Sequence, residues 1–237
     1  WPAVLESVFV SLAGIIDTFM VSSMGTYAVA ATGLIIQPKF LSLSFFFAIN
    51  VAVSALVARR LGQNNRRNAN QVLVTALMMI LLLCVVLTIV TVIFANPLIA
   101  ICGSNADTHE GAVIYFRVIQ VGMIFNVLSL VINAAQRGAG NTKIAMITNV
   151  TSSIVNIIFN YLLIGGNFGF PKWGLFGAAF ATVLGTVFAC AMSVHSLFQK
   201  DSYVSIPYIL EEKIKPDFGT FNAIQKLGAN ILFENWA

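Results

Sequence analysis

The sequence predicts an all-α polytopic membrane protein with six transmembrane helices. Two observations carry this prediction. The 237 residues are 58% hydrophobic and only 9% charged, whereas the surface of a soluble domain needs far more charge. Apolar runs of about 20 residues, the length that crosses a bilayer, also recur along the chain. The three cysteines are scattered and form no Cys-x-x-Cys or Cys/His motif, so the sequence indicates neither a disulfide framework nor a metal site of that kind.

Six spans follow from the apolar runs and from the turn-rich segments between them. They are predicted at residues 3–23, 28–58, 71–95, 112–136, 143–165 and 174–198. The second span is long and contains Pro38, which predicts a kink or a break at that residue. After Gln199 the chain becomes polar, and this predicts a long connector with an amphipathic segment on the membrane surface.

The basic residues gather in alternate loops and set the predicted orientation. They occupy the loop after the second span, the loop after the fourth span and the tail: Arg59, Arg60, Arg66, Arg67, Arg137, Lys143, Lys200, Lys213, Lys215 and Lys226. The positive-inside rule places these segments in the cytoplasm, so both ends of the chain are predicted to be cytoplasmic, in a plasma-membrane protein. Because the basic residues flank membrane spans, no nucleic-acid partner is expected.

Polar side chains from four predicted spans lie at similar depths in the outer half of the membrane. At 1.5 Å per residue, Asp17 lies about 9 Å, Asn160 about 8 Å and Thr182 about 12 Å from the outer ends of their spans. Asn156 shares a helical face with Asn160, and Lys39 lies at a comparable or somewhat greater depth. Since lipid offers these groups no partner, they predict a shared polar cavity that opens outward.

Simpler explanations stay open for the same residues. Asn and Thr in membrane helices often hydrogen bond a neighbouring helix only for packing, and Asp17 with Lys39 could form a buried structural ion pair. Gln37 and Pro38, beside Lys39, are further candidate cavity residues. In the sixth span a small residue at every fourth position predicts the close approach of another helix. The residues of this stripe are Gly177, Ala181, Gly185, Ala189 and Ser193.

Several stretches together resemble the multidrug and toxic compound extrusion (MATE) transporter family. They are IIDTFMVSSMGTYAVAATG at 15–33, VARRLGQNN at 57–65, QRGAGNTK at 136–143, NIIFNYLLIGG at 156–166 and GLFGAAFATVLG at 174–185. The resemblance implies two six-helix lobes, of which this chain is the first. It divides the chain into a six-helix lobe (1–198), a cytoplasmic connector (199–226) and the truncated start of a second lobe (227–237).

The resemblance also implies roles for the polar residues. Asp17 matches the first-helix acidic residue that couples transport to a cation or a proton, and Asn156 and Thr182 match its polar partners. Asn160 departs from the pattern, because members with the fullest site carry Asp there. Lys39 departs as well, since that stretch is mostly apolar in the family. The implied coupling ion is H⁺ or Na⁺, with a candidate Na⁺ site at Asp17, Asn156 and Thr182 and no other cofactor.

The sequence therefore predicts a secondary active transporter, and not an enzyme, that exports small organic compounds in exchange for H⁺ or Na⁺. The expected partners are a small-molecule substrate, membrane lipid and the second lobe. One alternative is a flippase for lipid-linked oligosaccharides of the same superfamily, which Lys39 favours. Another is a membrane assembly subunit that does not transport. An intramembrane enzyme is disfavoured because no second carboxylate or histidine lies at helical spacing from Asp17.

Overall fold

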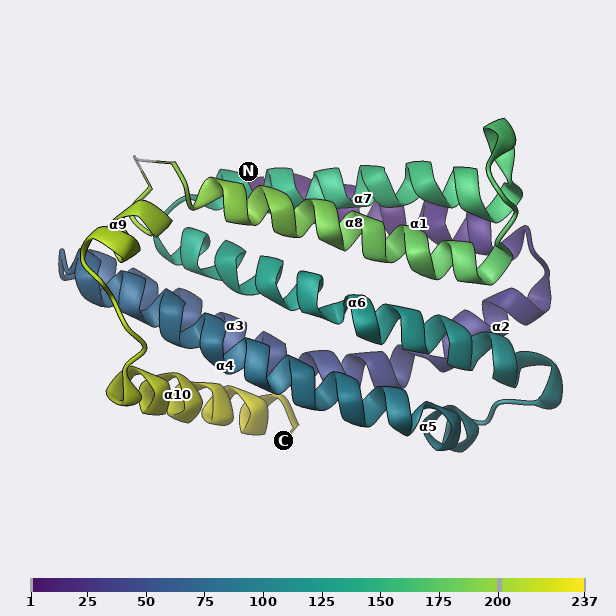
Figure 1. The fold of residues 1–237 in the computed structure, drawn as a ribbon, viewed down its shortest axis with the longest axis horizontal. Coiled ribbons are helices and arrows are strands. Elements are labelled where there is room, and N and C mark those ends of the chain that lie inside the picture. The colour runs from purple at the N-terminus through teal and green to yellow at the C-terminus, as the bar shows by residue number, and fades with distance from the viewer. Residues whose placement is uncertain (1, 200–201, 237) are drawn as a thin grey trace.

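The computed structural model describes residues 2–199 and 202–236, except for the side chains of residues 2, 3 and 232–236. The regular structure in this part of the chain is helical, as predicted. The elements are α1 (Pro2–Ser22), α2 (Thr26–Leu34), α3 (Ile36–Gly62), α4 (Arg66–Ile93), α5 (Ala95–Ile101), α6 (Ala106–Gly138), α7 (Thr142–Gly165), the 3₁₀ helix η1 (Asn167–Gly169), α8 (Gly174–Ser196), α9 (Ile206–Glu211) and α10 (Phe218–Trp236). The long helices run roughly along one axis, with the turns at its two ends (Figure 1).

Within the described residues, six helical segments are long and apolar enough to cross a membrane. They are α1, α2 together with α3, α4, α6, α7 and α8, and each overlaps one predicted span. Helix α5 occupies a segment that was predicted as a loop, and α6 begins at Ala106 instead of residue 112. Pro97 does not prevent α5, because it falls in the first turn, where its missing N–H costs no hydrogen bond. Helix α10 begins at Phe218, inside the predicted connector.

The second span breaks at Ile35, three residues before Pro38, as the prediction of a break at this proline implies, because Pro38 has no N–H to bond the Leu34 carbonyl. Helix α2 ends at Leu34 and α3 begins at Ile36, so Pro38 is the third residue of the new helix. The first N–H groups of a helix have no partner within it, so a proline is tolerated there without a kink. The Pro38 carbonyl accepts a hydrogen bond from the Ser42 hydroxyl (3.0 Å).

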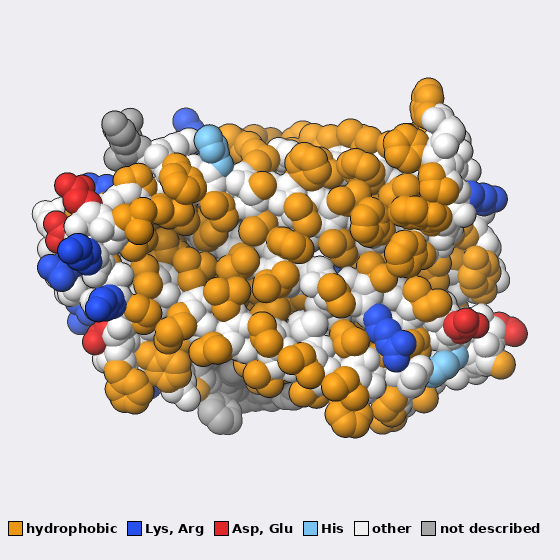
Figure 2. Space-filling model, viewed as in Figure 1, with side chains coloured by type: hydrophobic (Ala, Val, Ile, Leu, Met, Phe, Trp, Pro, Cys, Tyr) orange, Lys and Arg blue, Asp and Glu red, His pale blue; other side chains and the backbone are white. Residues whose placement is uncertain are grey.

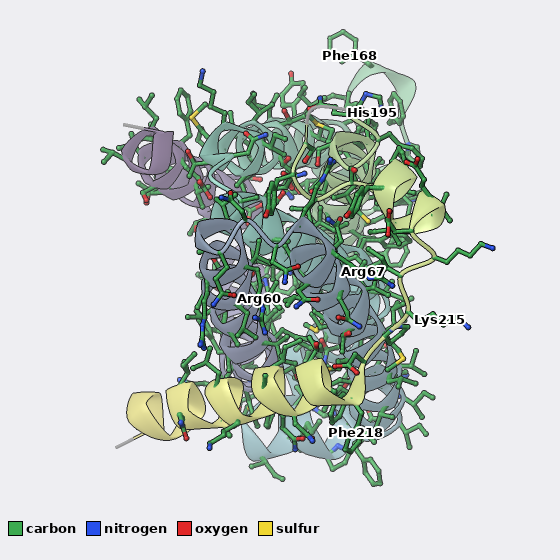
Figure 3. The ribbon with its side chains drawn as sticks, turned by 90° about the vertical axis from the view of Figure 1, so that its left-hand side faces the viewer. Arg60, Arg67, Phe168, His195, Lys215 and Phe218 are labelled. Atoms are coloured by element: carbon green, nitrogen blue, oxygen red, sulfur yellow. The ribbon has the colours of Figure 1, made fainter. Side chains whose placement is uncertain are left out.

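Charged side chains gather at the ends of the bundle. Figure 2 shows mostly apolar side chains across the middle of one face, with basic and acidic groups mainly toward its two ends. Arg60, Arg67 and Lys215 lie at the end that faces the viewer in Figure 3, which we call the basic end. The α1–α2, α5–α6 and α7–α8 connections lie at the opposite end (Figure 1). An apolar belt between two polar ends is the surface that a bilayer requires.

Small residues bring α7 and α8 into close contact. A Cβ atom added to Gly177 would lie 2.7 Å from the Leu163 carbonyl oxygen, and one added to Gly185 would lie 2.8 Å from that of Ser152. All five residues of the predicted small-residue stripe are buried. At Gly177 and Gly185 the helix that approaches the stripe is therefore α7, whereas the Ser193 hydroxyl at the other end of the stripe bonds Ser129 and Asn133 of α6.

The first part of the connector is fixed to the basic end of the bundle. The Arg66 guanidinium donates hydrogen bonds to the backbone carbonyls of Ser202 (2.9 Å) and Tyr203 (3.1 Å). The Asn70 amide nitrogen also donates to the Tyr203 carbonyl (3.1 Å), and its oxygen accepts from the Ser205 N–H (3.0 Å). The segment from residue 202 to residue 205 is thus an ordered part of the lobe, held on α4.

Candidate functional site

One chain of polar contacts crosses three helices. The Asn160 amide Nδ2 on α7 donates a hydrogen bond to the Asp17 carboxylate on α1, and it also donates to Asn156 Oδ1 (3.3 Å). Asn156 Nδ2 in turn donates to the Thr182 hydroxyl on α8 (3.1 Å). Thr182 completes the chain by donating to the Ala178 carbonyl (3.0 Å). The structure thus brings together Asp17, Asn160 and Thr182, for which the sequence predicted similar depths, and Asn156, for which it predicted a helical face shared with Asn160.

Helix packing positions this chain. Asn156 and Asn160 are one turn apart on α7, so they present their amides along one face. The close approach at Gly185, whose added Cβ would lie 3.3 Å from the Asn156 Cβ, keeps α8 within hydrogen-bonding distance of Asn156. Asn160 is fully buried (0% exposed), whereas Asp17 is only partly buried. The chain therefore joins a partly accessible carboxylate to a fully buried amide, and its other members, Asn156 and Thr182, are partly buried.

The orientation of the Asn160 amide follows from its neighbours. Asp17 presents a carboxylate, and Asn156 presents its oxygen because its own nitrogen is bonded to Thr182. Both neighbours accept hydrogen bonds, so the Asn160 nitrogen faces them and its oxygen faces away. That oxygen is buried and has no hydrogen-bond partner. A buried polar atom without a partner is uncommon and needs an explanation.

Tyr115 on α6 is a member of this group that the sequence did not reveal. It is 7% exposed. Its hydroxyl lies beside Thr182 and is close enough to Asp17 to interact with it electrostatically. A tyrosine in an apolar run is usually a core residue, so its type alone gave no signal. Its depth in the membrane would have indicated that it belongs to the site. From the observed start of α6 at Ala106, Tyr115 lies about 14 Å inward, close to the predicted depth of Thr182, but the span was predicted to begin at residue 112.

Lys39 is near the polar chain but does not form an ion pair with Asp17. It lines a small cavity of about 30 Å³ between α3, α6 and α8, together with Asn126, Thr182 and Thr186. The two charges interact electrostatically, yet in the described part of the chain no contact within 4 Å joins the Asp17 carboxylate to the Lys39 ammonium. The alternative of a direct structural ion pair therefore has no support in this arrangement.

The other two candidate cavity residues lie elsewhere. Gln37 is exposed and lines a separate pocket of about 370 Å³ with Ala30, Cys102 and Asn105. Pro38 is buried within the first turn of α3. The structure does not bring Gln37 to the Asp17 group, because Gln37 and Lys39, two residues apart on α3, lie on different faces of the helix.

Each of the three candidate Na⁺ ligands has an oxygen that accepts a hydrogen bond in this arrangement. Hard cations are held by several converging oxygens. Here Asp17 Oδ1 and Asn156 Oδ1 both accept from the Asn160 Nδ2 group, and the Thr182 hydroxyl oxygen accepts from Asn156 Nδ2. Hydrogen-bond donors occupy the space between the candidate ligands. Among the described residues, no group of three or more His, Cys, Asp or Glu side chains could hold a metal ion either.

Comparison with known proteins gives the family. A family model described as MatE matches residues 2–162, which is most of the chain. The chain belongs to the MatE family. "Probable multidrug resistance protein YoeA" of Bacillus subtilis (strain 168) is 31% identical to it over 187 residues, which cover 78% of this chain and 40% of YoeA. The "FAD transporter" of Shewanella oneidensis is 30% identical over 184 residues, which cover 78% of this chain and 41% of that protein.

Solved structures confirm the lobe architecture. An outward-facing multidrug resistance MATE family transporter of the MOP superfamily superimposes with a TM-score of 0.88 at 27% identity, over 98% of this chain and 50% of that one. A MATE protein in the bent conformation gives a TM-score of 0.84 at 29% identity, over 96% of this chain and 50% of that one. The chain spans about half the length of such relatives. It is a multi-pass membrane chain from a family of transporters rather than of enzymes.

Proposed function

We propose that this lobe belongs to a plasma-membrane antiporter that exports small organic compounds in exchange for H⁺ or Na⁺, with both ends of the chain in the cytoplasm. The observation that carries the proposal is the polar chain from Asp17 to Thr182, which joins three membrane helices and contains one partly accessible carboxylate. Placing an ionisable group at this depth costs free energy, so its presence there indicates a function. The names of the relatives, which refer to multidrug resistance and FAD transport, support organic compounds as substrates.

Asp17 is the proposed coupling group because its charge controls a contact between helices. In the ionised form its carboxylate accepts the hydrogen bond from Asn160 that links α1 to α7. A proton on the carboxyl group would weaken that acceptor and add a donor. The two forms thus favour different arrangements of α1 on α7, and a ligand shifts a conformational equilibrium only through such a difference.

Between the two coupling ions, the side-chain arrangement favours H⁺. A proton needs only the carboxylate, whereas Na⁺ needs several oxygens that are here directed at N–H groups. Asn160, where the fullest sites of the family carry Asp, also leaves Asp17 as the single carboxylate of the group. The proposed exchange is therefore H⁺ for substrate.

A flippase for lipid-linked oligosaccharides is the second candidate, and Lys39 is the observation that favours it. Such a substrate carries phosphate, which an intramembrane ammonium would attract. The cavity at Lys39 is only about 30 Å³, however, which has room for about two water molecules at roughly 10–15 Å³ each. A role in assembly alone leaves the unpartnered buried oxygen of Asn160 without an explanation.

The test uses the full-length transporter that contains this lobe, reconstituted in liposomes with a fluorescent organic cation such as ethidium. A pH gradient alone should drive efflux, and a Na⁺ gradient alone should not. Asp17→Asn should reduce efflux to background with little change in thermal stability, because Asn keeps the size and most hydrogen bonds. Asp107→Asn, which alters an exposed carboxylate at the start of α6, is the matched control and should transport normally.

A double variant separates coupling from a structural role. If Asp17 only neutralised Lys39, then Asp17→Asn would leave a buried ammonium unpaired and cost about 3–5 kcal/mol of stability. Adding Lys39→Met would then restore both stability and transport. If Asp17 couples transport, the double variant is stable and still inactive. Wild-type, gradient-dependent efflux by the double variant would refute the proposal.

A further inference from the structure

The small cavity between α3, α6 and α8 is lined by two side chains that have free hydrogen-bond donors. Its polar lining is Lys39 from α3, Asn126 from α6, and Thr182 and Thr186, one turn apart, from α8. No carboxylate is among its described lining residues. We propose that this cavity binds a monatomic anion, such as chloride, as a counter-ion for Lys39. This anion site is independent of the proposed export function.

The free donors are the ammonium of Lys39 and the amide of Asn126. In the described part of the chain neither side chain makes a hydrogen bond, and no carboxylate lies within 4 Å of the ammonium. Neither group is among the buried polar atoms without a partner, so a water-sized molecule reaches both. The hydroxyls of Thr182 and Thr186 instead donate to carbonyls of their own helix (3.0 and 2.8 Å). Lys39 and Asn126 are therefore the donors that a ligand in the cavity can use.

The charge of Lys39 requires an anion rather than a neutral ligand. An ammonium within a membrane-spanning lobe is costly unless an opposite charge lies in contact with it. Asp17 interacts with Lys39 electrostatically, but it is beyond ion-pair distance and its carboxylate accepts a hydrogen bond from Asn160. A water molecule would satisfy the two donors without compensating the charge, whereas an anion does both.

The size of the cavity selects the kind of anion. Its volume of about 30 Å³ has room for about two water molecules at roughly 10–15 Å³ each, and a chloride ion is only slightly larger than a water molecule. The cavity cannot widen at Gly122, because even an added Cβ there would overlap the side chain of Val183. A phosphate or carboxylate group with an organic body attached is too large. The site therefore accepts chloride or bromide and excludes polyatomic anions.

Bromide locates the site directly, because it replaces chloride and scatters X-rays anomalously. Crystals of the full-length transporter grown in sodium gluconate and soaked in sodium bromide should show an anomalous peak in contact with the Lys39 ammonium. The Kd of chloride is obtained from the rise in Tm of the same protein as sodium chloride replaces sodium gluconate at constant ionic strength, since a ligand of the folded state stabilises it. Methanesulfonate, a larger monovalent anion, is the size control and should give no saturable rise.

Four variants test the contacts. Lys39→Met should abolish both the bromide peak and the chloride-dependent rise in Tm, and in gluconate it should be at least as stable as the wild type, because it removes the unpaired ammonium. Asn126→Leu should raise the Kd of chloride about five- to tenfold, the effect of one lost hydrogen bond. Asp17→Asn should lower that Kd several-fold, because it removes a nearby negative charge. Arg117→Met removes an exposed basic residue of α6 outside the cavity, and as the matched control it should leave the Kd unchanged.

Several outcomes would overturn the anion site. If no bromide peak lies at Lys39, or the wild type gives no saturable response to chloride, the cavity takes water only. An equal chloride-dependent rise in Tm for the wild type, Lys39→Met and Arg117→Met would be a general effect of salt. An equal response to methanesulfonate would refute the selection by size. In each of these cases a gradient-driven ethidium efflux that depends on Asp17 would leave the proposed function intact.

Discussion

Gly185 is the position where close packing of α7 and α8 controls the polar chain. A Cβ atom there would lie 2.8 Å from the Ser152 carbonyl oxygen, whereas ordinary contacts begin at 3.4 Å. Gly185→Ala therefore pushes the helices apart by about 0.5 Å if the backbones move as rigid bodies. The hydrogen bond from Asn156 to Thr182, now 3.1 Å, would stretch to about 3.6 Å, which is beyond hydrogen-bonding distance.

The expected loss of stability combines three contributions. Overpacking costs about 1–3 kcal/mol, and the broken hydrogen bond costs about 1 kcal/mol. Replacing glycine by alanine within a helix stabilises the helix by roughly 1 kcal/mol, which offsets part of this loss. The net loss is therefore about 2 kcal/mol. For a chain of this size that corresponds to a fall of roughly 4–8 °C in Tm.

Buried cysteines provide the assay. Cys84 and Cys190 are buried, so a thiol-reactive fluorescent dye reports their exposure as the detergent-solubilised protein is heated, in a Cys102→Ser background. Gly14→Ala is the matched control, because a Cβ there would meet no heavy atom within 4 Å. Its Tm should be unchanged or slightly higher. Equal Tm values for Gly185→Ala and Gly14→Ala would refute the link between this contact and the site.

Two further predictions concern the orientation and the connector. In a cysteine-free background of the full-length transporter in intact cells, an impermeant maleimide should label a single cysteine at Asn167 and not one at Gln63; labelling at Gln63 would reverse the proposed topology. Arg66→Ala removes the two hydrogen bonds to the connector carbonyls, so it should cost about 1–3 kcal/mol and expose the connector to limited proteolysis. Arg67→Ala, which removes only an exposed ion pair with Glu212 at 3.6 Å, should cost at most about 1 kcal/mol; equal protease sensitivity of the two variants would contradict the assigned role of Arg66.

The membrane architecture and the members of the polar chain were largely predictable from the sequence. Each span is a local property, since about 20 apolar residues in a row are enough to cross a bilayer. Depth is also nearly local, because the rise along a helix is fixed at about 1.5 Å per residue. Asp17, Asn160 and Thr182 were therefore selected by depth, and Asn156 by its helical face shared with Asn160; the structure places these four in one hydrogen-bonded chain.

Only the tertiary structure decided which groups meet at that depth. Depth is one coordinate, whereas contact also depends on how each helix is rotated and which helix lies next to it. Those are set by side chains far apart in sequence, such as the glycines of α8 against the backbone of α7. Packing therefore brought Tyr115 to the site, kept Lys39 more than 4 Å from Asp17, and left the buried Asn160 oxygen without a hydrogen-bond partner.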